Sequence, residues 1–340
     1  MIKRILNRIT HRIHTLPVLV LMPHSRCNCR CVMCDIWKAN SAKKELTVED
    51  LQPHLQSFQK LNVKRVALSG GEAMMHSNLW TFCAMLKELG IKISLLTTGI
   101  TLKHNASSVI EHCDDVIVSL DGTPEIHTQV RNIPEAYRKL EDGVKEIKRL
   151  KPDFRVTARC VIQKSNFRYF TEIIQTAKQL GVDQISFLPA DVSSAAFNRP
   201  TPWEDEKVSD IALTAEDAAE LQKLINETIK NRPELFESRF VAESPKKLLQ
   251  MSQYYLAIQG QTKFPAQYCN APWVSAVVES NGDVMPCFFH RAYGNIYDAN
   301  FEEVINSPKA IQFRKELDMS SNETCRRCVC SLNVTPLQKV

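Results

Sequence analysis

Strand-like and helix-like segments alternate between residues 18 and 188, and this alternation limits the folds open to the chain. Apolar runs typical of buried strands occur at 18–22, 63–69, 91–98, 114–120, 154–162 and 182–188. Runs typical of helices lie between them at 48–61, 78–89, 103–111, 134–150 and 167–180. This order predicts a parallel sheet covered by helices. Because β–α–β crossovers are right-handed, we expect an α/β fold built on a partial (β/α)6 TIM-like barrel.

Conspicuous residues follow each predicted strand. Residues 25–34, which contain four cysteines, follow the first strand, and Ser-Gly-Gly-Glu at 69–72 ends the second. The later strands end in the residues 97–99, 119–122, Gln163 with Asn166, and 188–189. Carboxyl ends of strands are the face where β/α barrels build active sites. The sequence therefore predicts an active site at this end of the barrel.

The cysteine-rich segment, residues 25–34, carries a spacing suited to metal. Cys27, Cys31 and Cys34 follow the pattern Cys-x3-Cys-x2-Cys. Three thiolates on one short loop can converge on an iron–sulfur cluster, and three instead of four would leave one iron open for chemistry. Zinc sites favour two separated pairs, and disulfides need an oxidising compartment. Cys29 permits other triplets, so the spacing alone leaves these alternatives open.

Together with Gly-Gly-Glu at 70–72, this spacing resembles the radical S-adenosylmethionine (radical SAM) superfamily. The resemblance implies that Cys27, Cys31 and Cys34 hold a catalytic [4Fe–4S] cluster whose open iron chelates SAM. It also implies that Gly70, Gly71 and the Glu72 carboxylate hold the methionine ammonium, which agrees with close backbone approach at glycine and charge pairing at glutamate.

Four further SAM contacts follow from the resemblance. Met33 occupies a position, usually aromatic, whose backbone faces the adenine. Ser119 and Arg159 match positions that contact the ribose and the carboxylate, and Leu188 matches one that packs near the adenine. The ordinary alternatives are that Leu188 is a core residue and that Arg159 pairs with Asp121 or Glu72.

The overall composition is that of a globular chain. Of 340 residues, 44% are hydrophobic and 24% are charged. No apolar run approaches the roughly 18 residues of a membrane span, and no cleavable signal is evident. Twelve cysteines without an export signal indicate metal ligands and buried thiols, so we expect a reducing cytoplasm.

Residues 2–16 have the pattern of a basic amphipathic helix. Isoleucines and leucines at positions 2, 5, 6, 9, 13 and 16 share one helical face, and residues 1–34 hold six basic and no acidic residues. Such a helix could lie on an anionic membrane surface. The alternative, which we favour, is that it packs beneath the barrel as a lid on its bottom face.

A long segment interrupts the alternation after the sixth strand. Residues 191–213 contain prolines, Trp203 and an acidic run, and they leave the strand on the predicted active face. Long segments of this kind are often functional loops, so residues 191–213 could close over a substrate or could be a surface excursion. Helices are expected next, at 213–229 and 245–258.

The C-terminal part contains a predicted hairpin between two cysteines. Residues 274–279 and 283–285 flank Asn-Gly at 281–282, a strong hairpin signal. The hairpin would bring Cys269 and Cys287 together. This pair predicts one half of a second metal site.

Two more cysteines follow helices expected near 301–306 and 308–318. Cys325 and Cys328, added to the hairpin pair, would complete one closed tetrahedral site for a [4Fe–4S] cluster or zinc. Cys330 could replace Cys328 as a ligand or stay free. Cysteines 29, 83, 113 and 160 are expected to be buried thiols.

The tail resembles the opening of the SPASM domain that follows many radical SAM barrels. Gly282 between Cys269 and Cys287, and the Gly-Asn-Ile at 294–296, carry this resemblance. Few cysteines follow Cys328, which resembles the shortened Twitch version with one auxiliary cluster. We divide the chain into an N-terminal helix (1–16), a radical SAM barrel (17–213), a helical linker (214–262) and an auxiliary cluster domain (263–340).

The resemblance implies reductive cleavage of SAM to a 5′-deoxyadenosyl radical that abstracts a substrate hydrogen. An auxiliary cluster with only cysteine ligands would accept an electron, which favours net oxidation. We expect a small polar metabolite such as a sugar, cyclitol or lipid-linked polyol as substrate. The alternatives are crosslinking or epimerisation of a ribosomally made peptide, and a non-catalytic metal-binding interaction protein.

Partner expectations follow from the same reasoning. The implied chemistry needs an electron donor such as flavodoxin or ferredoxin, and no nucleic-acid module is present. Membrane-surface contact through residues 1–16 remains the alternative to packing. His76, Arg131, His290 and Arg291 could reach substrate, but such residues are more often ordinary surface side chains.

Overall fold

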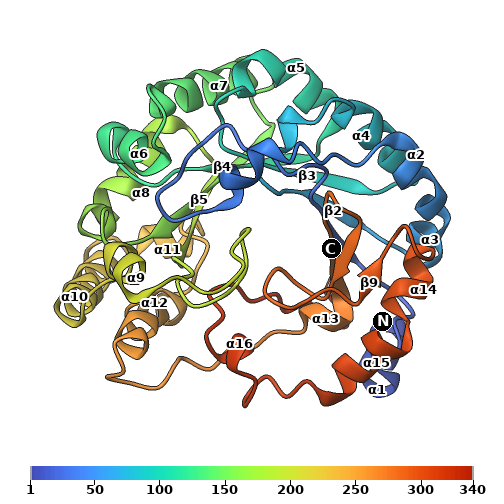
Figure 1. Ribbon diagram of the computed structural model, residues 1–340. Helices are drawn as coiled ribbons and strands as arrows, with labels where there is room; N and C mark the ends of the chain where they lie inside the picture. The colour runs from blue at the N-terminus through green and yellow to red at the C-terminus, as the bar shows by residue number, and fades with distance from the viewer. Residues whose placement is uncertain (1, 339–340) are drawn as a thin grey trace.

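The computed structural model describes residues 2–338 and contains one nine-stranded sheet (Figure 1). Its strand order is β6-β5-β4-β3-β2-β1-β7-β8-β9. The six barrel strands are parallel neighbours: β1 (Val18–Leu21), β2 (Arg65–Leu68), β3 (Lys92–Thr97), β4 (Asp115–Ser119), β5 (Arg155–Ile162) and β6 (Gln184–Pro189). This open arc of parallel strands confirms the predicted partial (β/α)6 barrel.

Helices cover the outer face of this arc (Figure 1). They are α2 (Val48–Leu51), α3 (Leu55–Lys60), α4 (Leu79–Glu88), α5 (Leu102–His112), α6 (Pro124–Arg131), α7 (Ala136–Leu150) and α8 (Phe170–Leu180). Thr47 starts α2 with a capping box to Asp50, and Gly181 ends α8 with a φ of 78°. The short helix α6 was not predicted; it ends at Asn132 in the left-handed conformation.

The segment after β6 is more helical than predicted. Residues 191–213 include α9 (Asp205–Ile211), and two long helices, α10 (Ala215–Asn231) and α12 (Pro245–Ile258), pack against each other beyond it. The short α11 (Glu234–Glu237) lies between them in sequence. These helices extend the outer layer past the last barrel strand.

The C-terminal part continues the barrel sheet. After α13 (Ala271–Val274), β7 (Ser275–Val278) pairs in parallel with β1 along its full length. The predicted hairpin is present as β7 and β8 (Asp283–Met285), with Gly282 at a φ of 84° in the turn, and β9 (Gly294–Asn295) follows. The helices α14 (Phe301–Ile305), α15 (Pro308–Glu316) and α16 (Glu323–Arg326) complete this part.

One hydrophobic core joins the barrel to the C-terminal part. Phe58 of α3 packs edge-on against Phe301 of α14, with ring centroids 5.1 Å apart. Arg314 of α15 is almost fully buried, and its guanidinium donates to the carbonyls of His11 and Ile305 at 2.6 and 2.7 Å. The two cysteine-bearing regions are therefore held by shared packing.

The N-terminal helix differs from the prediction. The helix α1 (Ile2–Thr10) stops six residues before the predicted end at residue 16, because His11 adopts a φ of 56° and turns the chain. Ile13 and Leu16 then enter the core, whereas Ile2 and Ile9 stay 68% and 69% exposed. The helix contacts α13 at the amino end of β7, beneath the barrel, but its apolar side chains do not enter the core there.

Among residues 2–338, no helix is both long and apolar enough to cross a membrane.

Candidate active site

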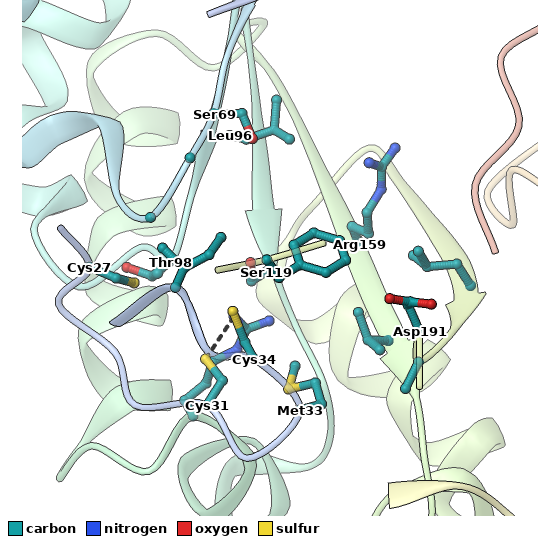
Figure 2. Close-up of a pocket in the computed structure, with 18 of the residues that line it drawn as sticks. Cys27, Cys31, Met33, Cys34, Ser69, Leu96, Thr98, Ser119, Arg159 and Asp191 are labelled. Atoms are coloured by element: carbon teal, nitrogen blue, oxygen red, sulfur yellow. Dashed lines mark hydrogen bonds between the residues drawn. The ribbon is translucent and has the colours of Figure 1, made fainter. Parts of the chain in front are cut away.

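A cavity of about 220 Å³ lies at the carboxyl ends of the barrel strands (Figure 2). Cys27, Cys31 and Cys34, from the loop after β1, all line it. The other predicted cofactor residues that line it are Met33, Gly70, Gly71, Ser119, Arg159 and Leu188. These residues come from the ends of β1, β2, β4, β5 and β6. The structure thus gathers into one cavity residues that are up to 161 positions apart in the chain.

Gly71 allows the cysteine loop to pack directly on the end of β2. A Cβ atom at this position would lie 2.0 Å from the Arg26 carbonyl oxygen and 2.9 Å from the Cys27 Cβ. The Glu72 amide donates to the same Arg26 carbonyl at 3.0 Å. Gly70 has a φ of 109°, which favours glycine. The glycine pair therefore has a local structural role in placing Cys27.

Glu72 lies behind the cavity wall. Its carboxylate is fully buried, and its Oε2 accepts from the Thr97 hydroxyl at 2.9 Å and from the amide and hydroxyl of Thr98, both at 2.7 Å. Burial raises the pKa of this carboxyl, against the effect of those hydrogen bonds. Glu72 therefore ties the end of β2 to the end of β3, and its role as a partner of the SAM ammonium stays a prediction.

Arg131, named from the sequence among side chains that could reach substrate, is a buried member of the cavity lining. It is buried, forms an ion pair with the fully buried Asp121, and donates to the Cys31 Sγ at 3.5 Å. The alternative that Arg159 pairs with Asp121 or Glu72 is wrong, since the Arg159 Nε contacts the Ser186 hydroxyl at 3.4 Å. In the sequence, Asp121 after β4 was the only indication that a buried cation would be needed here.

The segment 191–213 reaches back to the cysteine loop. Phe197 and Arg199 line the cavity, and Arg199 pairs with Asp191 at 3.1 Å while stacking over the Trp203 ring at 4.1 Å. The Trp203 indole donates to the Asp35 carboxylate at 2.7 Å, one residue beyond Cys34. This contact favours the prediction that the segment closes the active face. Asp35 and Arg199 were not singled out by the sequence.

A second cavity, of about 100 Å³, lies in the C-terminal part and is surrounded by cysteines. It is lined by the four predicted ligands, Cys269, Cys287, Cys325 and Cys328, and also by Cys330. Cys330 is exposed, and its backbone amide donates to the Cys328 Sγ at 3.4 Å. His290, whose Nε2 lies 3.3 Å from the Cys325 Sγ, also lines it.

Both cysteine sets fit an iron–sulfur cluster. Burial raises the pKa of Cys27, Cys34 and Cys287 to about 12, so a bound cation is needed to keep these groups as thiolates. Among the described residues, no three His, Cys, Asp or Glu side chains stand close enough to hold a single metal ion. Three cysteines around one cavity and four predicted ligands around the other agree with the cysteine ligation of iron–sulfur clusters.

The remaining cysteines are buried thiols. Cys29, Cys83, Cys113 and Cys160 are all buried and line neither cavity, in agreement with the sequence interpretation.

Two family models match the chain. The model of the radical SAM superfamily matches residues 21–177, and that of the SPASM iron–sulfur cluster-binding domain matches residues 269–329. The chain belongs to the radical SAM superfamily. The first match contains Cys27, Cys31 and Cys34, and the second contains Cys269, Cys287, Cys325 and Cys328.

Curated relatives of this radical SAM protein differ in what they make. It is 25% identical over 313 residues to the AdoMet-dependent heme synthase of Methanosarcina barkeri, covering 86% of this chain and 82% of the relative. It is 22% identical over 316 residues to the subtilosin biosynthesis protein AlbA of Bacillus subtilis, covering 90% of this chain and 63% of AlbA.

A solved structure shares the same fold. Streptococcus suis SuiB, crystallised with its precursor peptide SuiA, matches 96% of this chain and 74% of SuiB, with 16% identity and a TM-score of 0.65.

The radical SAM protein is an enzyme that uses SAM, a catalytic [4Fe–4S] cluster and an auxiliary iron–sulfur cluster in its SPASM domain. The residues suited to hold these groups are the cysteines of the two cavities, and their individual assignment as ligands stays a prediction.

Proposed function

We propose that this radical SAM enzyme oxidises a small polar metabolite that binds between its two cluster sites. One observation carries the proposal: a third cavity, of about 430 Å³, adjoins both sites. It shares Ile36, Gly71 and Phe197 with the cysteine-loop cavity, and Phe288, Phe289 and His290 with the auxiliary cavity. A substrate in this space would lie beside both clusters.

The lining of this substrate cavity is both polar and aromatic. Lys44, Arg291 and Glu279 supply charges, His24 and Asn281 supply hydrogen-bonding groups, and three phenylalanines supply apolar surface. Such a mixture favours a ligand with hydroxyl or carboxylate groups on a compact frame. The volume suits a metabolite of a few rings, within the about 300–1,000 Å³ typical of ligand sites.

Residues of this chain position the substrate and enclose the space in which it reacts. When bound, SAM and the catalytic cluster supply a hydrogen-abstracting 5′-deoxyadenosyl radical, and the auxiliary cluster supplies an electron acceptor. The substrate loses one hydrogen atom, one electron and one proton. Arg199, held by Asp191 and Trp203, lies over the Phe197 ring, and these two lining residues exclude water from the space between the sites.

Peptide modification is the second candidate. The substrate cavity shares Ala195, Phe289, His290 and Arg291 with a further cavity of about 790 Å³ beneath residues 191–213. Two adjoining cavities of this size could take an extended chain. The matches to AlbA and SuiB support this candidate by similarity alone.

Deuterium transfer will distinguish the two candidates. We expect deuterium in the 5′-deoxyadenosine product when the enzyme, SAM and dithionite are incubated with the small-molecule filtrate of an extract from cells grown in deuterated water. The unlabelled filtrate is the control for exchange. If deuterium reaches 5′-deoxyadenosine only when the peptide fraction is supplied, the substrate is a peptide and not a small metabolite. Label from neither fraction would contradict hydrogen abstraction from a substrate of either class.

Two partners complete the proposal. A low-potential donor such as flavodoxin or ferredoxin would reduce the catalytic cluster, and a membrane surface would contact the exposed apolar side chains of the N-terminal helix. The division at residues 16, 213 and 262 stays a proposal, supported by the two matched regions but not by a break in the sheet.

A further inference from the structure

The N-terminal helix is attached to the protein through its polar face. The Asn7 side chain is fully buried and donates to the carbonyls of Thr15 and Trp273 at 2.7 and 2.8 Å. Arg4 donates to the Thr335 and Gln338 carbonyls at 2.9 and 2.7 Å. A helix usually turns its apolar face to the core. These contacts fix α1 in the reverse orientation.

The face left outside is apolar and flanked by cations. Ile2, Ile5, Leu6 and Ile9 are 68%, 42%, 36% and 69% exposed, and the helical period places them on one side, opposite Asn7. Lys3 and Arg8 border this side, and both are exposed. Leu337, in the segment that Arg4 holds, is 79% exposed.

We propose that this face of α1 is a docking surface for an anionic lipid bilayer, a role that goes beyond the proposed catalytic function. Charge decides between the candidate occupants. Residues 1–16 carry four basic residues and no acid, so two copies meeting through this face would repel each other. Anionic headgroups would attract the cations while the four apolar side chains enter the acyl boundary.

The docking face lies away from the active site. α1 contacts α13, which leads into the amino end of β7, and Thr15 precedes the amino end of β1. The cysteine loop leaves the opposite, carboxyl end of β1. A bilayer at α1 would therefore hold the enzyme without covering the active face.

Vesicle flotation tests this surface. We expect the full chain to float with vesicles of phosphatidylglycerol and phosphatidylcholine, and not with phosphatidylcholine alone. Ile5→Ser with Ile9→Ser will weaken binding tenfold or more, and Lys3→Gln about fivefold. Leu150→Ser, at an exposed leucine of α7, is the matched control and will bind as wild type.

Three outcomes would overturn the docking proposal. They are equal binding to both kinds of vesicle, binding that survives Ile5→Ser with Ile9→Ser, and a dimer in sedimentation experiments that these substitutions dissociate. The last outcome would assign the face to a second copy of the chain.

A different observation concerns the surroundings of Cys31. Arg131 is the last residue of α6; its carbonyl accepts from the Arg30 amide at 3.2 Å, and the preceding Val130 carbonyl accepts from the Val32 amide at 3.2 Å. The end of α6 thus holds the backbone on both sides of Cys31. The Arg131 guanidinium then reaches the Cys31 Sγ at 3.5 Å.

Asp121 fixes this guanidinium from the other side. It is fully buried and pairs with Arg131, and its Oδ1 accepts from the Val161 amide at 2.9 Å. A buried cation beside a cluster ligand stabilises the more negative, reduced state of the cluster, and its buried anion offsets part of that effect. The pair therefore lies where its two charges act on the cluster with opposite signs.

We infer that Arg131 and Asp121 are positioning residues that set the reduction potential of the catalytic cluster. Replacing the cation will lower the potential, and replacing the anion will raise it. This inference rests on the assignment of Cys31 as a ligand of the catalytic cluster. Iron content, measured in the same samples, separates failure of that assignment from failure of the inference.

Potentiometric titration, followed by the electron paramagnetic resonance (EPR) signal that changes on SAM addition, measures these shifts. We expect Arg131→Gln to lower the equilibrium constant for cluster reduction about tenfold, which is a fall of about 59 mV in the reduction potential for one electron. We expect Asp121→Asn to raise the reduction potential. Arg131→Lys will lie between wild type and Arg131→Gln. Arg65→Gln, which removes the cation of the Arg65–Asp115 pair at the amino end of β2, is the control.

Shifts of the same sign in Arg131→Gln and Asp121→Asn, or no shift relative to Arg65→Gln, would overturn the inference. If Arg131→Gln fails to retain iron, Asp121→Asn decides, because an unchanged potential in that variant would mean that the charges of the pair do not act on the cluster.

Discussion

Replacing Cys27, Cys31 and Cys34 together with alanine will abolish SAM cleavage, reducing 5′-deoxyadenosine to the level without enzyme. All three cysteines line the cavity at the carboxyl ends of the barrel strands, and no other cysteine lines it. Iron will fall from about eight to about four atoms per chain, since one [4Fe–4S] cluster is lost and one remains. Anaerobic iron analysis and a dithionite-driven cleavage assay measure both effects.

The control removes cysteines that line neither cavity. Cys83→Ala with Cys160→Ala takes away two thiols that are buried in the barrel core. We expect its iron content to equal that of wild type. Residual cleavage in the triple variant, or complete loss of iron from it, would refute the separation of the two cluster sites.

Cys269→Ala with Cys287→Ala will leave SAM cleavage within about threefold of wild type while removing about four irons. These cysteines line only the cavity in the C-terminal part, and the core that holds the barrel does not depend on them. The SAM-dependent change in the EPR signal will persist. The same iron and cleavage assays measure the result.

Cys330→Ser tests the ligand set of this second site. Its exposed side chain and the contact of its amide with the Cys328 Sγ favour Cys328 as the ligand, so we expect the iron content of this variant to stay at the wild-type value.

If Cys269→Ala with Cys287→Ala abolished cleavage as fully as the triple variant, the auxiliary cavity would have a direct part in SAM cleavage, contrary to our account.

The barrel was predictable because its determinants are local. Alternating strand and helix patterns and the Asn281-Gly282 turn each act within a few residues, and both appear in the structure. Strand ends then gather at one edge by geometry alone, which brings the cysteine loop and Gly70 into one cavity.

Other features depend on long-range contacts that no local pattern encodes. The parallel pairing of β7 with β1 joins residues more than 250 positions apart. Orientation of α1 depends on where the buried Asn7 finds its partners, and amphipathic periodicity cannot reveal which face docks. Likewise, Glu72 turns toward Thr97 and Thr98 because the end of β3 offers three donors there.

Arg131 illustrates the same limit within the site. The sequence places it only among side chains that could reach substrate, and the fold alone places it between Asp121 and Cys31. A buried acid at a strand end predicts that some cation is needed, but it does not identify the cation.

The most direct test of the central claim is the EPR spectrum of the anaerobic, dithionite-reduced enzyme, recorded with and without SAM. Two distinct cysteine-lined cavities, each with one cluster, predict two EPR signals. One signal changes on SAM addition and the other does not. A single signal, or two signals that both stay unchanged on SAM addition, would contradict the account.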